Sequence, residues 1–143
     1  SLRYMSTIDI PVKRGTFIEF RNGMINLCPV GRSCTQEERM EFYDYDNKHH
    51  IRKNMVKHLN NELADLNMQF SIGGQISIDA FPKGWDKTYC LQFVEDKYDK
   101  IYFFGDRTME GGNDYEIFNH ERTEGYAVEK PEDTIKYLNE IFF

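Results

Sequence analysis

The sequence predicts an α/β protein of two consecutive domains, and three patterns support this fold class. Residues 15–28 and residues 68–81 each contain two short β-type runs around a turn, and a long stretch between them has helical periodicity. After residue 84, strand-like and helix-like segments alternate. Hairpins with helices indicate an antiparallel sheet, and alternation indicates parallel strands joined by crossovers. We therefore expect one domain over residues 1–84 and another over residues 85–143.

Two hairpins form the expected sheet of the first domain. Asn22-Gly23 lies between the apolar-rich runs of residues 15–28, and this dipeptide supplies the positive φ angles of tight hairpin turns. Residues 68–73 and 75–81 alternate between apolar and polar side chains on either side of Gly73-Gly74. These two runs therefore predict a second hairpin.

Helices should fill the space between the hairpins. Ser33 or Thr35 is placed to cap a helix, with Gln36 or Glu38 positioned for a capping box. From residue 37 to about residue 66, apolar residues recur at helical spacing. We expect the polar stretch of residues 44–50 to divide this region into two helices.

The second domain reads as alternating helices and strands. We expect helices over residues 86–95, 113–118 and 131–143, and strands over residues 100–104 and 125–129. Pro131 suits the first turn of the last helix. Two parallel strands are too few for a stable sheet, so the remaining strands should come from sequence outside these 143 residues.

Composition excludes several functional classes. The 18 Lys and Arg residues against 24 Asp and Glu residues give a net charge of -6, so no broad basic face is expected for nucleic acid or an anionic membrane. Apolar runs such as residues 101–104 are far shorter than the roughly 20 residues of a membrane span. The three cysteines lack metal-site spacing and are odd in number, which favours a reducing, cytoplasmic setting.

An acidic site is predicted where the strand of residues 100–104 ends. Asp106 follows this apolar strand, at the edge where open parallel sheets bind their ligands. Gly111-Gly112-Asn113-Asp114 follows, and its glycines permit unusual backbone angles. Alone, this tetrapeptide is more typical of a loop and helix cap. The whole string favours a Mg²⁺ site, because Mg²⁺ prefers one or two carboxylates together with substrate phosphate.

Three arginines predict an anion site in the first domain. Arg21 lies at the hairpin turn, Arg32 just before a helix and Arg39 in its first turns. Guanidinium groups bind phosphate oxygens in pairs, and a helix N-terminus adds partial positive charge. Equally, each arginine could pair with an acidic neighbour, of which there are three: Glu19, Glu37 and Glu38.

Further polar residues lie near the expected sites. Ser77 and Asp79 are two positions apart on one strand and share a face, which meets either water or the hydroxyl groups of a sugar. Solvent exposure is the commoner outcome for such a face. Lys87 follows the domain boundary and could balance carboxylate and phosphate charge, although most lysines at helix starts are only solvated. No nucleophile triad is visible.

Several long strings resemble the eukaryotic phosphomannomutase family of the haloacid dehalogenase superfamily. The resemblance spans nearly the whole chain and is specific, because the strings are long and occur in order. They are residues 13–24, 31–34, 36–39, 70–77, 84–87, 102–106 and 111–114.

The resemblance implies a fold and an activity. It implies an α/β cap domain, with an antiparallel sheet and helices, over residues 1–84, and the C-terminal part of a Rossmann-like catalytic core over residues 85–143. The implied enzyme interconverts mannose 6-phosphate and mannose 1-phosphate for GDP-mannose synthesis. It would use Mg²⁺ and a hexose 1,6-bisphosphate activator, and would be a cytoplasmic homodimer joined through its cap.

The resemblance also implies residue roles. Arg21, Arg32 and Arg39 would bind substrate phosphate, Ser77 and Asp79 would bind the sugar, and Lys87 would be the charge-balancing catalytic lysine. Metal binding would involve five residues, with support from Asn113: Asp106, Asp114, Phe118, His120 and Thr123. The family usually has an acidic residue where this chain has His120, so a backbone carbonyl would serve there instead of a side chain.

The chain departs from the family pattern in one respect. The family's Asp-x-Asp-x-Thr motif, which supplies the phosphoryl acceptor and the general acid and base, does not occur in these residues. We expect this chain to be the C-terminal portion of the enzyme and to be inactive alone. Two alternatives stay open: a sugar-phosphate phosphatase of the same superfamily, and a non-catalytic dimerisation or binding module.

Overall fold

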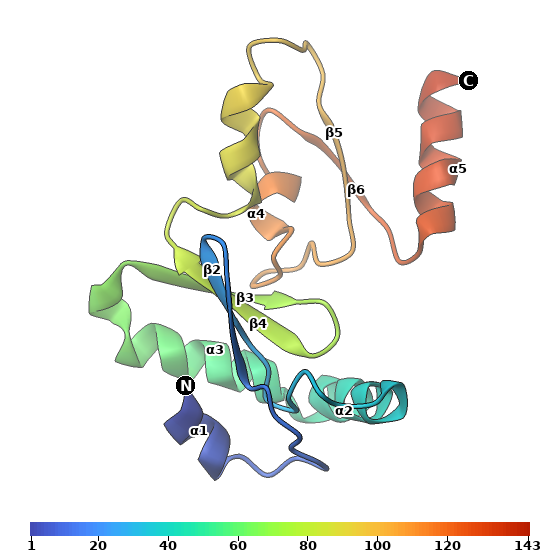
Figure 1. Cartoon of the computed structure of the whole chain (residues 1–143). Coiled ribbons are helices and arrows are strands. Elements are labelled where there is room, and N and C mark those ends of the chain that lie inside the picture. Colours follow the sequence, from blue (N-terminus) through green and yellow to red (C-terminus); the bar gives the residue numbers. More distant parts are fainter. The chain divides into compact units, whose positions relative to one another are not determined.

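The computed structural model describes all residues from Ser1 to Phe143 (Figure 1). The chain divides into two compact units, Ser1–Lys83 and Gly84–Phe143. Both units mix helices and strands, as the sequence predicts. No helix combines the length and the apolar character needed to cross a membrane.

The first unit contains a four-stranded antiparallel sheet. Its strands are β1 (Ile18–Arg21), β2 (Met24–Leu27), β3 (Met68–Gly73) and β4 (Ser77–Pro82), in the order β1-β2-β4-β3. Gly23 has a φ of 78° at the β1–β2 turn, so the predicted hairpin is confirmed. The second hairpin pairs β3 with β4 around Gly73-Gly74.

One helix precedes the first hairpin in the chain, and the others lie between the two hairpins. They are α1 (Leu2–Thr7), α2 (Gln36–His49), α3 (Ile51–Glu62) and the 3₁₀ turn η1 (Ala64–Leu66). Thr35 and Glu38 form the capping box of α2: the Thr35 hydroxyl accepts from the Glu38 amide, and the Glu38 carboxylate accepts from the Thr35 amide. The sequence predicts that the polar stretch of residues 44–50 separates the two helices, but most of it is helical. The two helices are separated by His50 alone, whose φ of 57° turns the chain.

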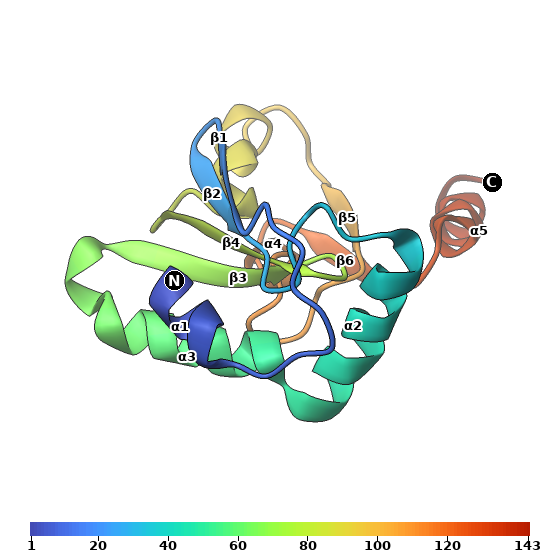
Figure 2. The same cartoon turned by 60° about the horizontal axis from the view of Figure 1, so that its bottom comes forward.

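The core of the first unit lies on one face of the sheet. Met55 and Leu59 of α3 pack against Leu27, Phe70 and Ile78, all of which are buried. Figure 2 shows α3 running along β3 and β4 on this side. Because side chains alternate along each strand, the polar residues of the same strands project from the opposite face.

The second unit is built on two parallel strands, β5 (Tyr102–Gly105) and β6 (Glu124–Ala127). The 3₁₀ helix η2 (Lys87–Phe93) precedes them, α4 (Tyr115–Phe118) connects them and α5 (Pro131–Phe142) follows. The predicted alternation and strand direction are confirmed, and α5 begins at the proline. The helix expected over residues 86–95 is a 3₁₀ helix instead of an α-helix.

The aromatic side chains on this small sheet are only partly buried. Phe104 and Tyr126 stack on neighbouring strands with ring centroids 5.3 Å apart, and Tyr137 of α5 lies 4.9 Å from Tyr126. Ile135 and Phe142 of α5 are 60% and 56% exposed. Apolar surface of this kind is typical of an interface.

Candidate functional site

A row of polar residues crosses the first unit's sheet on the face away from α3. Glu19 pairs with Asn26 across β1 and β2, Asn26 with Asp79 across β2 and β4, and Asp79 with Ser71 across β4 and β3. Directly opposed residues on neighbouring strands share one face. Ser77 lies two residues before Asp79 and is on that face too.

The loop after β2 brings Arg32 to this polar face. Gly31, with a φ of 89°, lets the chain turn back along residues 14–17. The Arg32 amide donates to the Thr16 carbonyl at 3.0 Å, and the Ser33 amide donates to the Gly15 carbonyl at 2.9 Å. These hydrogen bonds fix the backbone of Arg32 independently of the contacts that its side chain makes.

The Arg32 side chain contacts three residues of the polar face. Its Nη1 atom donates to Asn26 Oδ1 at 3.2 Å and to Ser77 Oγ at 3.3 Å. Its Nε atom lies 3.3 Å from Glu19 Oε2. The guanidinium thus lies over the polar face and remains partly exposed, with a side-chain exposure of 29%.

Glu19 joins two of the predicted phosphate-binding arginines. Arg21 Nε donates to Glu19 Oε1 at 2.6 Å, and Arg32 lies against the other oxygen of the same carboxylate. Both arginines therefore have the local acidic partner that the sequence left open. Because Glu19 is itself 38% exposed, the pairing keeps the two guanidinium groups together at the surface instead of burying them.

Arg39 differs from the other two arginines. It lies in the first turns of α2, and Glu38 beside it is paired with Arg14 and not with Arg39. No carboxylate lies within ion-pair distance of Arg39. Burial raises the pKa of the Cys28 thiol to about 11, and the positive charges of Arg32 and Arg39 both act against that rise.

Asn26 is a residue that sequence reasoning missed. Its side chain is buried, with 2% of the residue exposed, and its Nδ2 atom donates to Asp79 Oδ1 at 2.7 Å. Its Oδ1 atom accepts from Arg32. The alternation of β2 could have shown that Asn26 shares the face of Ser77 and Asp79, but nothing local indicates its partners.

The first unit therefore brings together four of its five predicted site residues by direct or shared contacts. Arg21 and Arg32 meet at Glu19, and Arg32 meets Ser77 directly and Asp79 through Asn26. Arg39, on α2, makes no ion pair or side-chain hydrogen bond with these four residues, and its role in phosphate binding stays a prediction. Guanidinium donors beside hydroxyl and carboxylate groups can bind a phosphate and the hydroxyls of an attached sugar.

In the second unit, Asp106 follows β5 at its carboxyl end. Its carboxylate is exposed, with 61% of the side chain accessible. Gly105 before it allows a close approach, since a Cβ atom there would lie 2.7 Å from Asp114 Oδ2. The sheet thus presents an exposed carboxylate, whose Oδ2 atom lies 4.0 Å from Arg107 Nε, at the edge where parallel sheets bind ligands.

Asp114 lies beneath this edge and is 2% exposed. Its Oδ2 atom accepts from the backbone amides of Asp106 and Arg107, at 3.1 Å each. Its Oδ1 atom is paired with Lys87 Nζ. Because both carboxylate oxygens already have donors, the observed geometry makes Asp114 a support for Asp106 and Lys87, and its predicted role as a metal ligand stays a prediction.

Asn113 lies in the loop that carries Asp114. Gly111 has a φ of 82°, and a Cβ atom on Gly112 would lie 2.1 Å from the Arg107 carbonyl oxygen. The Asp114 amide donates to that same carbonyl at 3.1 Å. The glycine pair is therefore needed for the loop to close under Asp106, and Asn113 is left half-buried beside it.

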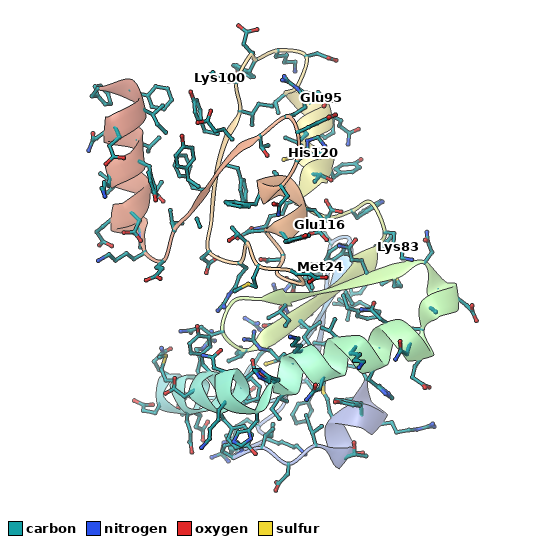
Figure 3. All side chains as sticks on the ribbon, turned by 180° about the vertical axis from the view of Figure 1, so that it is seen from behind. Met24, Lys83, Glu95, Lys100, Glu116 and His120 are labelled. Atoms are coloured by element: carbon teal, nitrogen blue, oxygen red, sulfur yellow. The ribbon has the colours of Figure 1, made fainter.

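The loop after α4 gathers backbone oxygen atoms around Thr123. The Thr123 hydroxyl lies within hydrogen-bond distance of two carbonyl oxygens, those of Ile117 and His120. Both carbonyls also accept backbone amides, Ile117 from His120 at 3.3 Å and His120 from Thr123 at 3.0 Å, so these atoms form a hydrogen-bonded turn and their role in cation binding stays a prediction. The His120 side chain accepts from the Arg122 amide at 3.2 Å, so its backbone carbonyl is the atom that faces Thr123. Figure 3 shows His120 in this loop and Glu116 on α4.

The residues present fit part of a Mg²⁺ site. Asp106 offers one exposed carboxylate beside the Lys87–Asp114 pair, and Mg²⁺ is commonly held by one or two carboxylates with waters and substrate phosphate. No three His, Cys, Asp or Glu side chains of the chain form a cluster that could hold a metal ion alone. Asp106 would therefore need further oxygen ligands from substrate, water or other protein residues.

Comparison with known proteins decides the family. A family model described as eukaryotic phosphomannomutase matches residues 1–143. The chain belongs to this family. It is 61% identical over 142 residues to the phosphomannomutase of Saccharomyces cerevisiae, covering 99% of this chain and 56% of the relative.

Two further relatives in the phosphomannomutase family are similarly close. The chain is 59% identical over 142 residues to the phosphomannomutase of Spinacia oleracea, covering 99% of this chain and 57% of the relative. It is 58% identical over 141 residues to a probable phosphomannomutase of Caenorhabditis elegans, covering 99% and 56%. The chain thus spans a little over half the length of these relatives.

Proposed function

We propose that this chain forms the substrate-holding part of a phosphomannomutase, which interconverts mannose 6-phosphate and mannose 1-phosphate for GDP-mannose synthesis. The observation that carries the proposal is the position of Arg32, whose guanidinium contacts Ser77 directly and Asp79 through Asn26. The guanidinium group and the hydroxyl and carboxylate groups lie side by side on one face of the sheet, where Arg32 is partly exposed and Ser77 is 7% exposed. Membership of the family supplies the reaction class.

In this account the first unit binds the substrate end that is not reacting. Arg21, Arg32 and Arg39 hold one phosphate, and Ser77 and Asp79 bind sugar hydroxyls. A mutase must hold a second phosphate far from the reacting centre, whereas a simple phosphatase has no such need. Binding energy from this remote phosphate favours closure and excludes water, so that transfer to sugar exceeds hydrolysis.

In the second unit, Lys87 balances negative charge at the carboxyl end of β5. Asp114 fixes the lysine and, through two backbone amides, the start of the Asp106 loop. Asp106 would hold Mg²⁺, with Asn113 nearby and with Phe118, His120 and Thr123 forming a second cation loop. Bound Mg²⁺ would neutralise charge on the transferring phosphoryl group.

The proposal includes the activator, the assembly and the location. A hexose 1,6-bisphosphate would activate the enzyme, because its two phosphates match the two ends of the reaction. The protein would be a cytoplasmic homodimer joined through the first unit, where Phe20 on the outer strand β1 is 82% exposed. The chain alone would bind sugar phosphate without turning it over, since it contains no Asp-x-Asp-x-Thr motif.

A coupled assay tests this proposal. Conversion of mannose 1-phosphate to mannose 6-phosphate is measured with Mg²⁺ and glucose 1,6-bisphosphate, for the full-length gene product and for this chain, together with released inorganic phosphate. We expect isomerisation well above phosphate release in the gene product and none in this chain. Phosphate release exceeding isomerisation would identify a phosphatase, and no turnover in either would favour a binding module.

A further inference from the structure

Asn26 is the one buried side chain that touches both halves of the proposed substrate site. It occupies the middle of the polar row, between Glu19 on β1 and Asp79 on β4. With 2% of the residue exposed, it has little surface with which to contact a ligand. Its role must therefore be exerted through its neighbours.

The amide group of Asn26 has the chemistry that these neighbours require. Arg32 offers only donors, and Asp79 as a carboxylate offers only acceptors. Asn26 accepts from Arg32 at 3.2 Å with its oxygen and donates to Asp79 at 2.7 Å with its nitrogen. Neither aspartate nor leucine of similar size could make both bonds, because aspartate lacks the donor and leucine lacks both groups.

We infer that Asn26 is a positioning residue that couples the phosphate-binding Arg32 to the sugar-binding Asp79. This inference rests on the proposed function. A shift of Arg32 toward a bound phosphate moves the Asn26 oxygen, and the same rigid amide moves the donor that orients Asp79. The site then recognises phosphate and sugar together, so a sugar phosphate is bound more tightly than its two parts would predict.

The strand pairing explains why the coupling runs through this residue. Asn26 and Asp79 are direct partners on β2 and β4, while Arg32 reaches the row from the loop that follows β2. Ser71 provides a matched comparison. It is also 2% exposed and also opposes Asp79, from β3, but makes no bond to Arg32.

A double-mutant cycle tests the coupling. Binding of mannose 1-phosphate to the 143-residue chain is measured by calorimetry for Arg32→Lys, Asp79→Asn and the double variant. With Asn26 present, we expect the effect of the double variant to differ from the product of the single effects by about threefold or more. In an Asn26→Ala background, the effect of the double variant on binding should equal the product of the two single effects within about twofold. In a Ser71→Ala background, the difference of about threefold or more should remain.

Each outcome decides the inference. Asn26→Leu, which keeps the approximate size of the side chain and lacks both polar groups, serves as the second background if Asn26→Ala does not fold, and it should also abolish the coupling. Coupling that survives in the Asn26 variants, or that is absent when Asn26 is present, overturns the inference while leaving the proposed function intact. Failure of the unsubstituted chain to bind mannose 1-phosphate overturns both.

Discussion

Gly31 packs directly on Gly15, and the contact leaves no room for a side chain. A Cβ atom on Gly31 would lie 2.2 Å from the Gly15 carbonyl oxygen, whereas a Cβ atom on Gly15 would meet nothing within 4 Å. Both residues have left-handed φ angles, of 89° and 90°. The contact fixes the loop that delivers Arg32, so this pair of glycines connects backbone packing to the proposed phosphate site.

Gly31→Ala should therefore be much more harmful than Gly15→Ala. Both substitutions place alanine in a left-handed conformation, at a cost of about 1–2 kcal/mol. Only Gly31→Ala adds a steric clash with backbone, and we expect it to lower the free energy of unfolding by at least about 2 kcal/mol more. Urea unfolding of the two variants measures the difference. Equal losses would mean that the close approach has no energetic consequence.

Glu19→Gln should strengthen anion binding. Glu19 is the negative charge between Arg21 and Arg32, and glutamine keeps an oxygen that can accept from Arg21. We expect inorganic phosphate to bind this chain about 3- to 10-fold more tightly at low ionic strength, with the gain shrinking as salt is added. Glu38→Gln, whose partner is Arg14, is the control. Weaker phosphate binding by Glu19→Gln would show that the carboxylate matters mainly for arginine placement.

Arg39→Ala should impair both binding and turnover in the full-length gene product. Arg39 has no carboxylate partner to leave unpaired, so its loss affects mainly the ligand. Removing one charge-assisted hydrogen bond should lower kcat/KM by about 10- to 100-fold, with KM raised and kcat lowered together. Arg14→Ala is the matched control, because Arg14 pairs with Glu38. Unchanged kinetics in Arg39→Ala would remove that arginine from the site.

Asp114→Asn should destabilise the second unit, while Asp106→Asn should not. Asparagine at position 114 cannot form the ion pair with Lys87. Its NH₂ group would also face either the Lys87 ammonium or the backbone amides of Asp106 and Arg107, which are all donors. We expect a loss of about 1–3 kcal/mol in the free energy of unfolding, measured by urea unfolding. The exposed Asp106 has no such burial, so its substitution should affect Mg²⁺ dependence of activity and leave stability nearly unchanged. A larger loss of stability in Asp106→Asn than in Asp114→Asn would contradict the roles given to the two aspartates.

Cys28 should make the first unit less stable at high pH. Burial raises the pKa of its thiol from 9.0 to about 11, so the folded chain holds this proton more tightly than the unfolded chain does. Its contribution is complete below pH 9 and is lost as the pH rises toward 11. The difference in unfolding free energy between the unsubstituted chain and Cys28→Ala should therefore shrink between pH 9 and pH 11. A difference that stays constant over this range would contradict the assignment.

Local signals predicted most elements of the fold. Asn22-Gly23 marked the first hairpin, and Thr35 with Glu38 marked the start of α2. No sequence pattern indicates α1, because this helix has only six residues and no side-chain cap; its Met5 is buried in the core of the first unit. The division between α2 and α3 was misplaced because it depends on one non-glycine residue, His50, in a left-handed conformation.

The sequence indicates which residues form the candidate site, but it reveals only part of the contacts between them. Arg21, Arg32, Ser77 and Asp79 are indicated by the sequence. The structure shows that most of their contacts pass through Glu19, which the sequence offers only as an ion-pair partner of the arginines, and through Asn26, which the sequence does not single out. Asn26 and Asp79 are 53 positions apart, so only the β2–β4 register brings them together. Likewise, both oxygens of Asp114 are occupied by donors that no local pattern reveals.

The polar face of the first unit is central to the proposed function, because it is where a sugar phosphate is proposed to bind. Titration of the ¹⁵N-labelled chain with mannose 1-phosphate, followed by NMR, tests this binding. We predict saturable shifts in the side-chain amide of Asn26 and the guanidinium of Arg32 and in the backbone amides of Ser77 and Asp79, with none on the α3 side of the sheet. An absence of saturable shifts, or shifts confined to the second unit, would contradict the proposed binding.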